Sequence, residues 1–262
     1  MHTGKFVSSL LPVMALALAP LFPSAAVAQP ADPTPFQKRV IEAMNSEIRS
    51  DEDRARDANR MPAEVLEFFR MREDMVVIEM LPARGWYSKI LGPVLKDKGK
   101  LYVTHPPGRY MDAFAPAKEL PGMEKVEELD WNGYPSPTGG FFDPTGEWDV
   151  EPVDMVLTFR NYHNFSSDDR MAVNRTVFDA LKPGGYYGVV DHTRRHMEAE
   201  NDVNGRRVDP VLNIKEVQDA GFVLVDFSDL LARPQDGLVY EVGNPEVRGQ
   251  SDRYALLFQK PE

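Results

Sequence analysis

The chain has 262 residues, with 41 Asp plus Glu against 30 Lys plus Arg, which gives a formal net charge of −11. Hydrophobic residues make up 42% and charged residues 27%, a balance typical of globular rather than disordered proteins. The sequence contains no cysteine, which excludes disulfides, thiolate metal sites and a cysteine nucleophile, and its acidic excess makes nucleic acid and anionic lipid poor partners.

The first 28 residues have the pattern of a signal peptide. Lys5 is the only charged residue before an apolar stretch from about residue 10 to 27, and Ala26-Val27-Ala28 has the small-x-small form that a signal peptidase cleaves. Prolines interrupt the stretch, which argues against a stable membrane-spanning helix. We therefore expect a mature chain that begins near Gln29, is periplasmic or secreted, and has no membrane contact. An uncleaved anchor is the alternative.

Residues 29–60 predict a linker and then a helix. Three prolines lie between residues 29 and 35, as in extended linkers, and apolar residues recur at helical spacing over 36–48. Arg54, Asp57 and Arg60 then recur every three residues, so they would share one helix face. A solvated, salt-linked face is the favoured interpretation, and a role for these arginines in capping a site is the alternative.

Residues 61–262 predict one α/β domain. Short β-branched runs alternate with helical patterns, which indicates βαβ units and a mostly parallel, doubly wound sheet. In such sheets ligands bind beyond the carboxyl ends of the strands, where the strand order reverses. The expected strands are 75–81, 100–104, 125–129, 153–159, 186–191, 222–227 and 254–258; the expected helices are 62–69, 86–95, 167–181 and 214–220, with turns at 82–85 and 182–185.

Several phrases in this order resemble class I S-adenosylmethionine-dependent methyltransferases. They are Val77-Ile78-Glu79, Pro82-x-x-Gly85-Trp86-Tyr87, Asp154-Met155-Val156-Leu157, Leu181-Lys182-Pro183-Gly184-Gly185 and Ala220-Gly221-Phe222. A bacterial group of exported predicted methyltransferases is more closely similar, through Arg60 with Pro62, Arg160-Asn161-Tyr162-His163 and Val190-Asp191-His192. The resemblance covers roughly residues 60–260. It implies a Rossmann-like, mostly parallel seven-stranded sheet with helices on both faces and an antiparallel last strand.

The resemblance also implies methyl transfer from S-adenosyl-L-methionine to a small-molecule substrate. The residues that would bind this cofactor are Glu79, Pro82, Gly85, Trp86, His105 and Arg160. Two departures from the family pattern weaken the expectation. Ala83 and Arg84 stand where the family has glycines, and alanine does not easily adopt a positive φ. His105 stands where an acid would hold the ribose, and it lacks the bidentate grip of a carboxylate. A decayed cofactor pocket is the alternative.

Polar residues follow the fourth and fifth expected strands, and we take His163, His192 and Asn161 as candidate catalytic residues. A histidine of near-neutral pKa can act as general base toward a hydroxyl or amine, whereas a loop-bonding role is the structural alternative. His192 and His196 have the spacing of helical metal ligands. Two arginines between them would repel a cation, so we expect no metal site.

Two further segments remain open. Residues 131–148 are rich in Pro, Gly and aromatic residues and are expected to form a lid or a packed surface loop. Arginines in the loop after the fifth strand, Arg194, Arg195, Arg206 and Arg207, would orient an anionic substrate or lie in solvent. Three functions compete: a methyltransferase, a non-catalytic binding module on the same fold, and a metal-dependent hydrolase. The sequence predicts neither the methyl acceptor nor the oligomeric state.

Overall fold

The structure is a computed structural model that describes residues 1, 32–106, 108–130 and 148–262. The chain divides into two units, Met1–Asp32 and Pro33–Glu262, and every helix and strand that is described lies in the second. The expected signal peptide at residues 1–28 and the expected lid at 131–148, apart from Trp148, lie outside the described residues. No helix in the described part of the chain is long and apolar enough to cross a membrane.

Seven strands form one sheet in the order β3-β2-β1-β4-β5-β7-β6. Neighbouring strands from β3 to β5 run parallel, and β7 runs antiparallel to both β5 and β6. The predicted mostly parallel seven-stranded sheet with an antiparallel last strand is therefore confirmed. The strands are β1 (Val76–Met80), β2 (Lys100–His105), β3 (Glu127–Asp130), β4 (Val153–Phe159), β5 (Leu181–His192), β6 (Val223–Ser228) and β7 (Arg253–Gln259).

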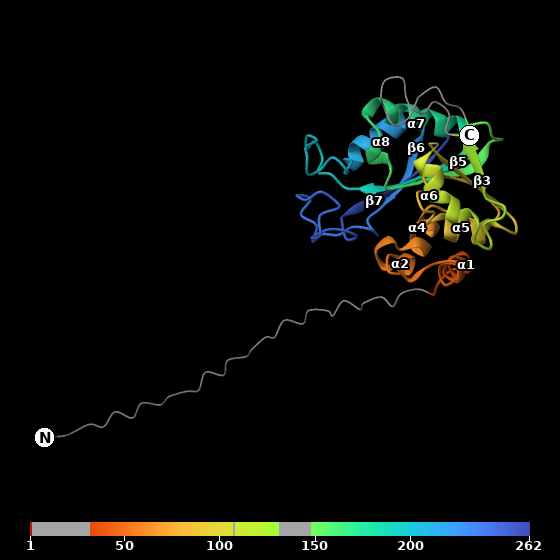
Figure 1. Ribbon diagram of the computed structural model, residues 1–262. Helices are drawn as coiled ribbons and strands as arrows, with labels where there is room; N and C mark the ends of the chain where they lie inside the picture. The colour runs from red at the N-terminus through yellow and green to blue at the C-terminus, as the bar shows by residue number, and fades with distance from the viewer. Residues whose placement is uncertain (2–31, 107, 131–147) are drawn as a thin grey trace. The chain divides into compact units, whose positions relative to one another are not determined.

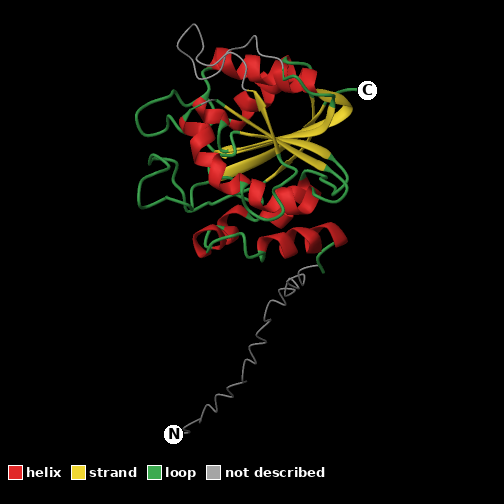
Figure 2. Ribbon diagram, turned by 45° about the vertical axis from the view of Figure 1, so that its right-hand side comes forward, coloured by secondary structure: helices red, strands yellow, loops and turns green. Residues whose placement is uncertain are grey.

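Helices cover both faces of this sheet, as Figure 2 shows. In Figure 1, α1, α2 and α4 are grouped on one side of the sheet, and α7 and α8 on the other. The helices are α1 (Pro35–Met44), α2 (Asp51–Arg54), α3 (Asp57–Arg60), α4 (Pro62–Phe68), α5 (Ser88–Leu95), α6 (Arg109–Lys118), the 3₁₀ helix η1 (Tyr162–Asn164), α7 (Ser167–Ala180) and α8 (Pro210–Asp219).

The sheet separates two hydrophobic cores, and consecutive residues of β1 belong to different ones. Val77 packs in the core shared with α1, α4 and α5, whereas Ile78 packs in the core shared with α7 and α8. Both residues are fully buried. This is why the apolar run of β1 is continuous rather than alternating, since a strand covered on both faces needs apolar residues at every position.

The structure differs from the expected elements at three places. Helix α6 was not predicted, because Pro116 lies inside it and only Phe114 and Ala117 supply a buried face. The expected turn at 182–185 belongs to β5, where the pairing with β4 shifts register. The expected helix over 36–48 ends at Met44, and its last residues form turns.

Candidate functional site

A cavity lies at the point where the strand order reverses. Strand β1 pairs with β2 on one side and with β4 on the other, so the connections from these strands leave in opposite directions. The cavity measures about 210 Å³, and its described lining consists of Leu81, Ala83, His105, Tyr110, Asn161 and Asn164. It therefore occupies the position at which ligands bind in doubly wound sheets.

The loop after β1 has a glycine-type backbone at two residues that are not glycine. Leu81 and Ala83 both have φ +52°, and Gly85 has φ +70°. A non-glycine residue in this region costs about 1–2 kcal/mol, so Leu81 and Ala83 adopt this conformation at a cost in backbone strain. A Cβ at Gly85 would lie 2.8 Å from the Ala117 Cβ in α6. Gly85 thus allows the close approach of this loop to α6.

Two residues predicted to bind or act at the cavity do line it. His105, at the end of β2, has its Nε2 3.1 Å from the Glu128 Oε2, an ion-pair distance without hydrogen-bond geometry. Asn161, after β4, donates its Nδ2 to the carbonyl oxygens of Met80 and Leu81 at 3.3 and 3.2 Å. Asn161 thereby ties the end of β1 to the end of β4 and fixes one wall of the cavity.

The other residues predicted to bind the cofactor are not among the described cavity lining. Pro82 accepts a hydrogen bond from the Gly85 N at 2.8 Å and shapes the loop. Glu79 is 3% exposed and accepts a 2.5 Å hydrogen bond from the Ser88 Oγ. Burial raises the pKa of Glu79 to about 7, against the opposing effects of Ser88 and the Arg60 charge. Trp86 faces the N-terminal helices, where its Nε1 donates to the backbone oxygen of Asp53 in α2.

His163 forms a hydrogen-bonded pair with Asp191. The His163 Nδ1 lies 2.7 Å from the Asp191 Oδ1, and the His163 backbone N donates to Oδ2 at 2.9 Å. Asp191 is fully buried. A carboxylate held in this way fixes the proton on Nδ1 and leaves the Nε2 lone pair available as a base. Asn161 and Asn164 flank His163 and line the cavity, so the base lies beside it.

The structure also brings His192 to His163, with 5.6 Å between the ring centroids. His192 is buried, and its Nδ1 lies 2.8 Å from the Ser251 Oγ. Burial, followed by the charges of Arg253 and Arg160, lowers the pKa of His192 well below its ordinary value. A ring with so low a pKa is a weak proton acceptor, so His163 is the stronger candidate base of the two.

The metal hypothesis required His192 and His196 to share a helix, and they do not. His192 ends β5, and residues 193–197 are not helical. The His196 Nδ1 instead lies 2.9 Å from the Asp209 Oδ2. Within the described ranges, no group of three or more His, Cys, Asp or Glu residues is placed to hold a metal ion.

The four arginines of the loop after β5 bind protein groups. Three of them form ion pairs with carboxylates, and the fourth donates to a backbone carbonyl. The pairs are Arg194 with Glu200, Arg206 with Glu241 and Arg207 with Asp236, and Arg195 donates to the Gly237 oxygen. These contacts hold the loop together. Arg195 and Arg206 lie in solvent, as one of the two hypotheses expected, whereas Arg194 and Arg207 are buried.

The solvated, salt-linked face predicted for Arg54, Asp57 and Arg60 is wrong for Arg60. The chain forms two short helices instead of one, so the three residues do not share a face. Arg54 pairs with Asp51 and Asp57 with Arg49, as salt links should. Arg60 is only 7% exposed, and its guanidinium carbon lies 4.2 Å from the Trp86 ring centroid.

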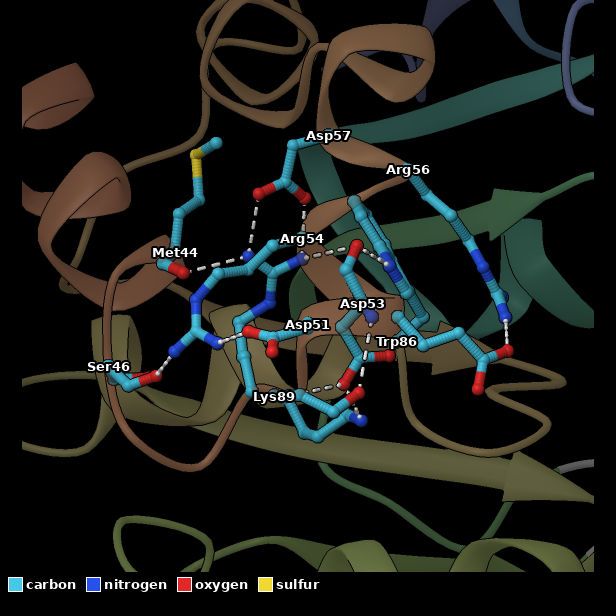
Figure 3. A network of polar contacts seen from close by, with 12 residues as sticks. Met44, Ser46, Asp51, Asp53, Arg54, Arg56, Asp57, Trp86 and Lys89 are labelled. Atoms are coloured by element: carbon cyan, nitrogen blue, oxygen red, sulfur yellow. Dashed lines mark hydrogen bonds and ion pairs between the residues drawn. The ribbon is translucent and has the colours of Figure 1, made fainter.

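A polar network fastens these short helices to Trp86. The Trp86 Nε1 donates to the Asp53 backbone oxygen at 3.0 Å, and the Asp53 carboxylate pairs with Lys89 of α5 (Figure 3). The Arg49 guanidinium carbon lies 4.9 Å from the Trp86 ring centroid, and Arg49 binds both oxygens of the Asp57 carboxylate. Trp86 is therefore an anchor for α2 and α3, and through them it positions Arg60 at the edge of the sheet.

Sequence reasoning missed two residues of this region. Tyr110 lines the cavity from α6, a helix that the sequence did not predict. Arg253 begins β7 and is 4% exposed, where it pairs in register with His192. A charged residue directly before the apolar run of 254–258 was the available signal, because a buried strand rarely begins with an arginine.

The fold is shared with solved structures. A SAM-dependent methyltransferase from Aquifex aeolicus matches with a TM-score of 0.57 and 13% identity over 85% of this chain and 97% of that one. The [4+2]-cyclase SpnF matches with a TM-score of 0.57 and 17% identity over 83% and 86%. Human N-acetylserotonin methyltransferase in complex with SAM matches with a TM-score of 0.53 and 13% identity over 87% and 57%.

No protein-family model and no curated protein matches the sequence. At identities of 11–17%, the structural likeness establishes the Rossmann-like methyltransferase fold alone. A fold of this kind hosts more than one chemistry, as the cyclase among its neighbours illustrates.

Proposed function

We propose that this protein transfers a methyl group from S-adenosyl-L-methionine to a small molecule, after export to the periplasm or out of the cell. The observation that carries the proposal is the His163–Asp191 pair beside the cavity at the reversal of strand order, in a fold shared with SAM-dependent methyltransferases. The exported location rests only on the pattern of residues 1–28.

The residues around the cavity fit such a cofactor in chemistry. His105, Tyr110 and Asn161 offer polar side chains for a ribose and a base, and Leu81 with Ala83 offers apolar surface. The cavity of about 210 Å³ is smaller than the roughly 300–1,000 Å³ of most ligand sites, so it accommodates part of the molecule. When bound, the cofactor supplies an electrophilic methyl group.

The residues of the chain supply the proton chemistry of the transfer. His163 would accept at Nε2 the proton that the acceptor hydroxyl or amine loses as its oxygen or nitrogen takes the methyl group, with S-adenosylhomocysteine as the leaving group. Asp191 keeps the other ring proton on Nδ1 and stabilises the imidazolium that results. Asn161 holds the end of β1 against the end of β4 and preserves the spacing between base and cavity.

Calorimetric titration of the mature chain with S-adenosylmethionine and with S-adenosylhomocysteine tests the proposal. We expect both to bind, and His105→Ala to weaken both because it removes a lining residue of the cavity. His163→Gln should lower S-adenosylhomocysteine formation from a panel of phenols and amines by about 10²–10⁴-fold. The matched control His196→Gln, which changes an exposed histidine outside the cavity, should not. Failure of the native chain to bind either compound would contradict the proposal.

The second candidate function, a non-catalytic binding module, is favoured by His105 at the ribose position and by the small cavity. Restoring the family pattern with Ala83→Gly, Arg84→Gly and His105→Asp separates the two. If the site has decayed, the triple variant should bind S-adenosylhomocysteine at least about tenfold more tightly, since one charge-assisted hydrogen bond is worth about 1.5–3 kcal/mol. Weaker binding by the triple variant would show that the natural residues are working parts.

A further inference from the structure

Three arginines from separate parts of the chain meet at the same edge of the sheet. Arg60 ends α3, Arg160 directly follows β4, and Arg253 begins β7. The Arg253 Nη1 donates to the Asn59 oxygen at 2.8 Å, one residue from Arg60. The Arg160 backbone N donates to the Val190 oxygen at 2.7 Å on the neighbouring strand. Arg160 has φ +61°, so the chain is strained where it places this side chain.

Tyr87 lies among the three arginines. The Arg60 guanidinium carbon is 6.0 Å from the Tyr87 ring centroid. The same ring stacks on Phe159, the residue before Arg160, with centroids 3.5 Å apart and planes 10° from parallel. Burial raises the pKa of Tyr87 to about 12, and the charges of all three arginines oppose that rise. The three cations thus act on one buried phenol.

None of the three arginines forms a direct ion pair with a carboxylate within the described part of the chain, although the Arg60 charge acts on Glu79. Other buried arginines have one: Arg49 pairs with Asp57 and Arg170 with Glu216. Arg60 makes only ring contacts with its guanidinium. The Arg253 Nη1 and Nη2 donate to the backbone oxygens of Asn59 and Gly249, and its Nε is buried without a hydrogen-bond partner. Asp191 acts on Arg160 and Arg253 through its charge, but its oxygens are occupied by His163 and by the His192 backbone N.

This arrangement costs free energy in the absence of a ligand. Burial and then the Arg160 charge lower the pKa of Arg60 to about 9 and that of Arg253 to about 10. All three side chains are still charged at neutral pH. Like charges removed from water without a partner destabilise a fold, and an anion placed among them would offset both the burial and the repulsion.

We propose that Arg60, Arg160 and Arg253 bind the carboxylate or phosphate group of an anionic ligand. Because Arg160 follows β4 and Arg253 lies in register with His192, this group would sit near the His163–Asp191 pair. We therefore identify the ligand as the methyl acceptor, a small molecule that carries a carboxylate or phosphate group. Its identification as the acceptor rests on the proposed function, whereas the binding of the anion does not.

Titration with simple anions tests the site without the cofactor. The probes are phenyl phosphate and benzoate, with phenol and benzamide as uncharged controls, measured by calorimetry in a low-chloride Tris buffer. We expect the native chain to bind at least one anion and neither control. Arg60→Gln and Arg160→Gln should each weaken that binding at least about tenfold, since each removes charge-assisted hydrogen bonds. Arg175→Gln, which changes an exposed arginine of α7, should bind the anion as the native chain does.

Thermal melting distinguishes a binding role from a structural one. Without an anion, Arg160→Gln should melt at or above the native temperature, because it removes repulsion from Arg60 and Arg253. A loss of several degrees together with unaltered anion affinity would overturn the proposal. So would native protein that binds S-adenosylhomocysteine but no anion. Native protein that binds an anion but no S-adenosylhomocysteine would support the anion site and overturn its assignment to a methyl acceptor.

Discussion

Two buried arginines have opposite environments. Arg170 lies between α7 and α8 and has a carboxylate partner, whereas Arg60 lies at the edge of the sheet and has none among the described residues. Between the helices, the Arg170 Nε and Nη2 bind both oxygens of Glu216 at 2.7 and 2.8 Å, and its Nη1 donates to the Phe165 oxygen. Burial disfavours the Arg170 charge, but Glu216 more than compensates, and the pKa of Arg170 rises. At the sheet edge, Arg60 is equally buried without a carboxylate partner, and its pKa falls to about 9.

The presence or absence of a carboxylate partner distinguishes a buried arginine that stabilises the fold from one that is placed to bind a ligand. A buried ion pair whose hydrogen bonds are complete needs nothing further. Buried charges without a partner, together with left-handed backbone at Ala83 and Arg160, are costs that a chain retains where function requires them. They are found here at the carboxyl ends of β1 and β4, where a ligand is expected on topological grounds.

The largest effect on stability should follow from breaking the Arg170–Glu216 ion pair. Glu216→Gln leaves the Arg170 charge buried without its counter-charge, which should lower the free energy of unfolding by about 3–5 kcal/mol. Urea denaturation of the native and variant chains measures it. Replacing both partners, Arg170→Met with Glu216→Leu, should recover most of the loss. By contrast, Arg60→Gln should change stability by less than about 1 kcal/mol. If Glu216→Gln and Arg60→Gln lowered the free energy of unfolding equally, the proposed difference between the two arginines would be wrong.

Glu79 should make the free energy of unfolding depend on pH, and this effect should be intermediate in size. Its pKa is raised by burial to about 7 in the folded chain, against about 4.3 when unfolded. Between these values the folded state binds the extra proton, so stability through this group is greatest below pH 4 and falls as the pH rises toward 7. At about 1.36 kcal/mol for each pH unit between the two pKa values, the loss approaches ~4 kcal/mol.

Glu79→Gln isolates this contribution, because glutamine has similar shape and still accepts the hydrogen bond from the Ser88 Oγ. Relative to the native chain, the variant should become progressively more stable from pH 5 to pH 8, as followed by urea denaturation at each pH. Asp154→Asn is the opposite control, because the pKa of Asp154 is lowered through hydrogen bonds to Lys182 and the Val76 N, despite burial. Parallel pH curves for the native chain and Glu79→Gln would refute the raised pKa.

The sequence predicted the sheet because its signals are local. Residues such as Val77 and Ile78 are apolar in succession wherever a strand is covered on both faces, and the turn residues between elements are equally readable. His163 and His192 were predicted to lie together because both follow neighbouring parallel strands, and the structure brings them to 5.6 Å. Their catalytic role stays a prediction.

The sequence singled out Arg160 as a cofactor-binding residue and offered a site-capping role for Arg60 as an alternative, but it did not predict that these two arginines group with Arg253, because the group depends on long-range geometry. Arg253 reaches His192 through an antiparallel register that only the folded sheet defines. Arg60 is buried because the chain breaks into α2 and α3 and folds onto Trp86, whereas its spacing from Arg54 and Asp57 favoured one exposed helix face. The same limit applies to Tyr110, since a helix with Pro116 inside it and few buried residues has a weak sequence pattern.

The smallest effect concerns the strained loop after β1. Ala83→Gly should relieve about 1–2 kcal/mol of left-handed strain at φ +52°, but glycine loses about 0.5–1 kcal/mol more conformational entropy on folding. The net gain in unfolding free energy should therefore lie between zero and about 1.5 kcal/mol. Gly85→Ala is the matched contrast, because its new Cβ would lie 2.8 Å from the Ala117 Cβ and its φ is +70°. That variant should lose stability, and urea denaturation of the two variants beside the native chain compares them directly. If Ala83→Gly instead destabilises the chain, the left-handed conformation at Ala83 is not strained, and the loop offers no sign of a function retained at the expense of stability.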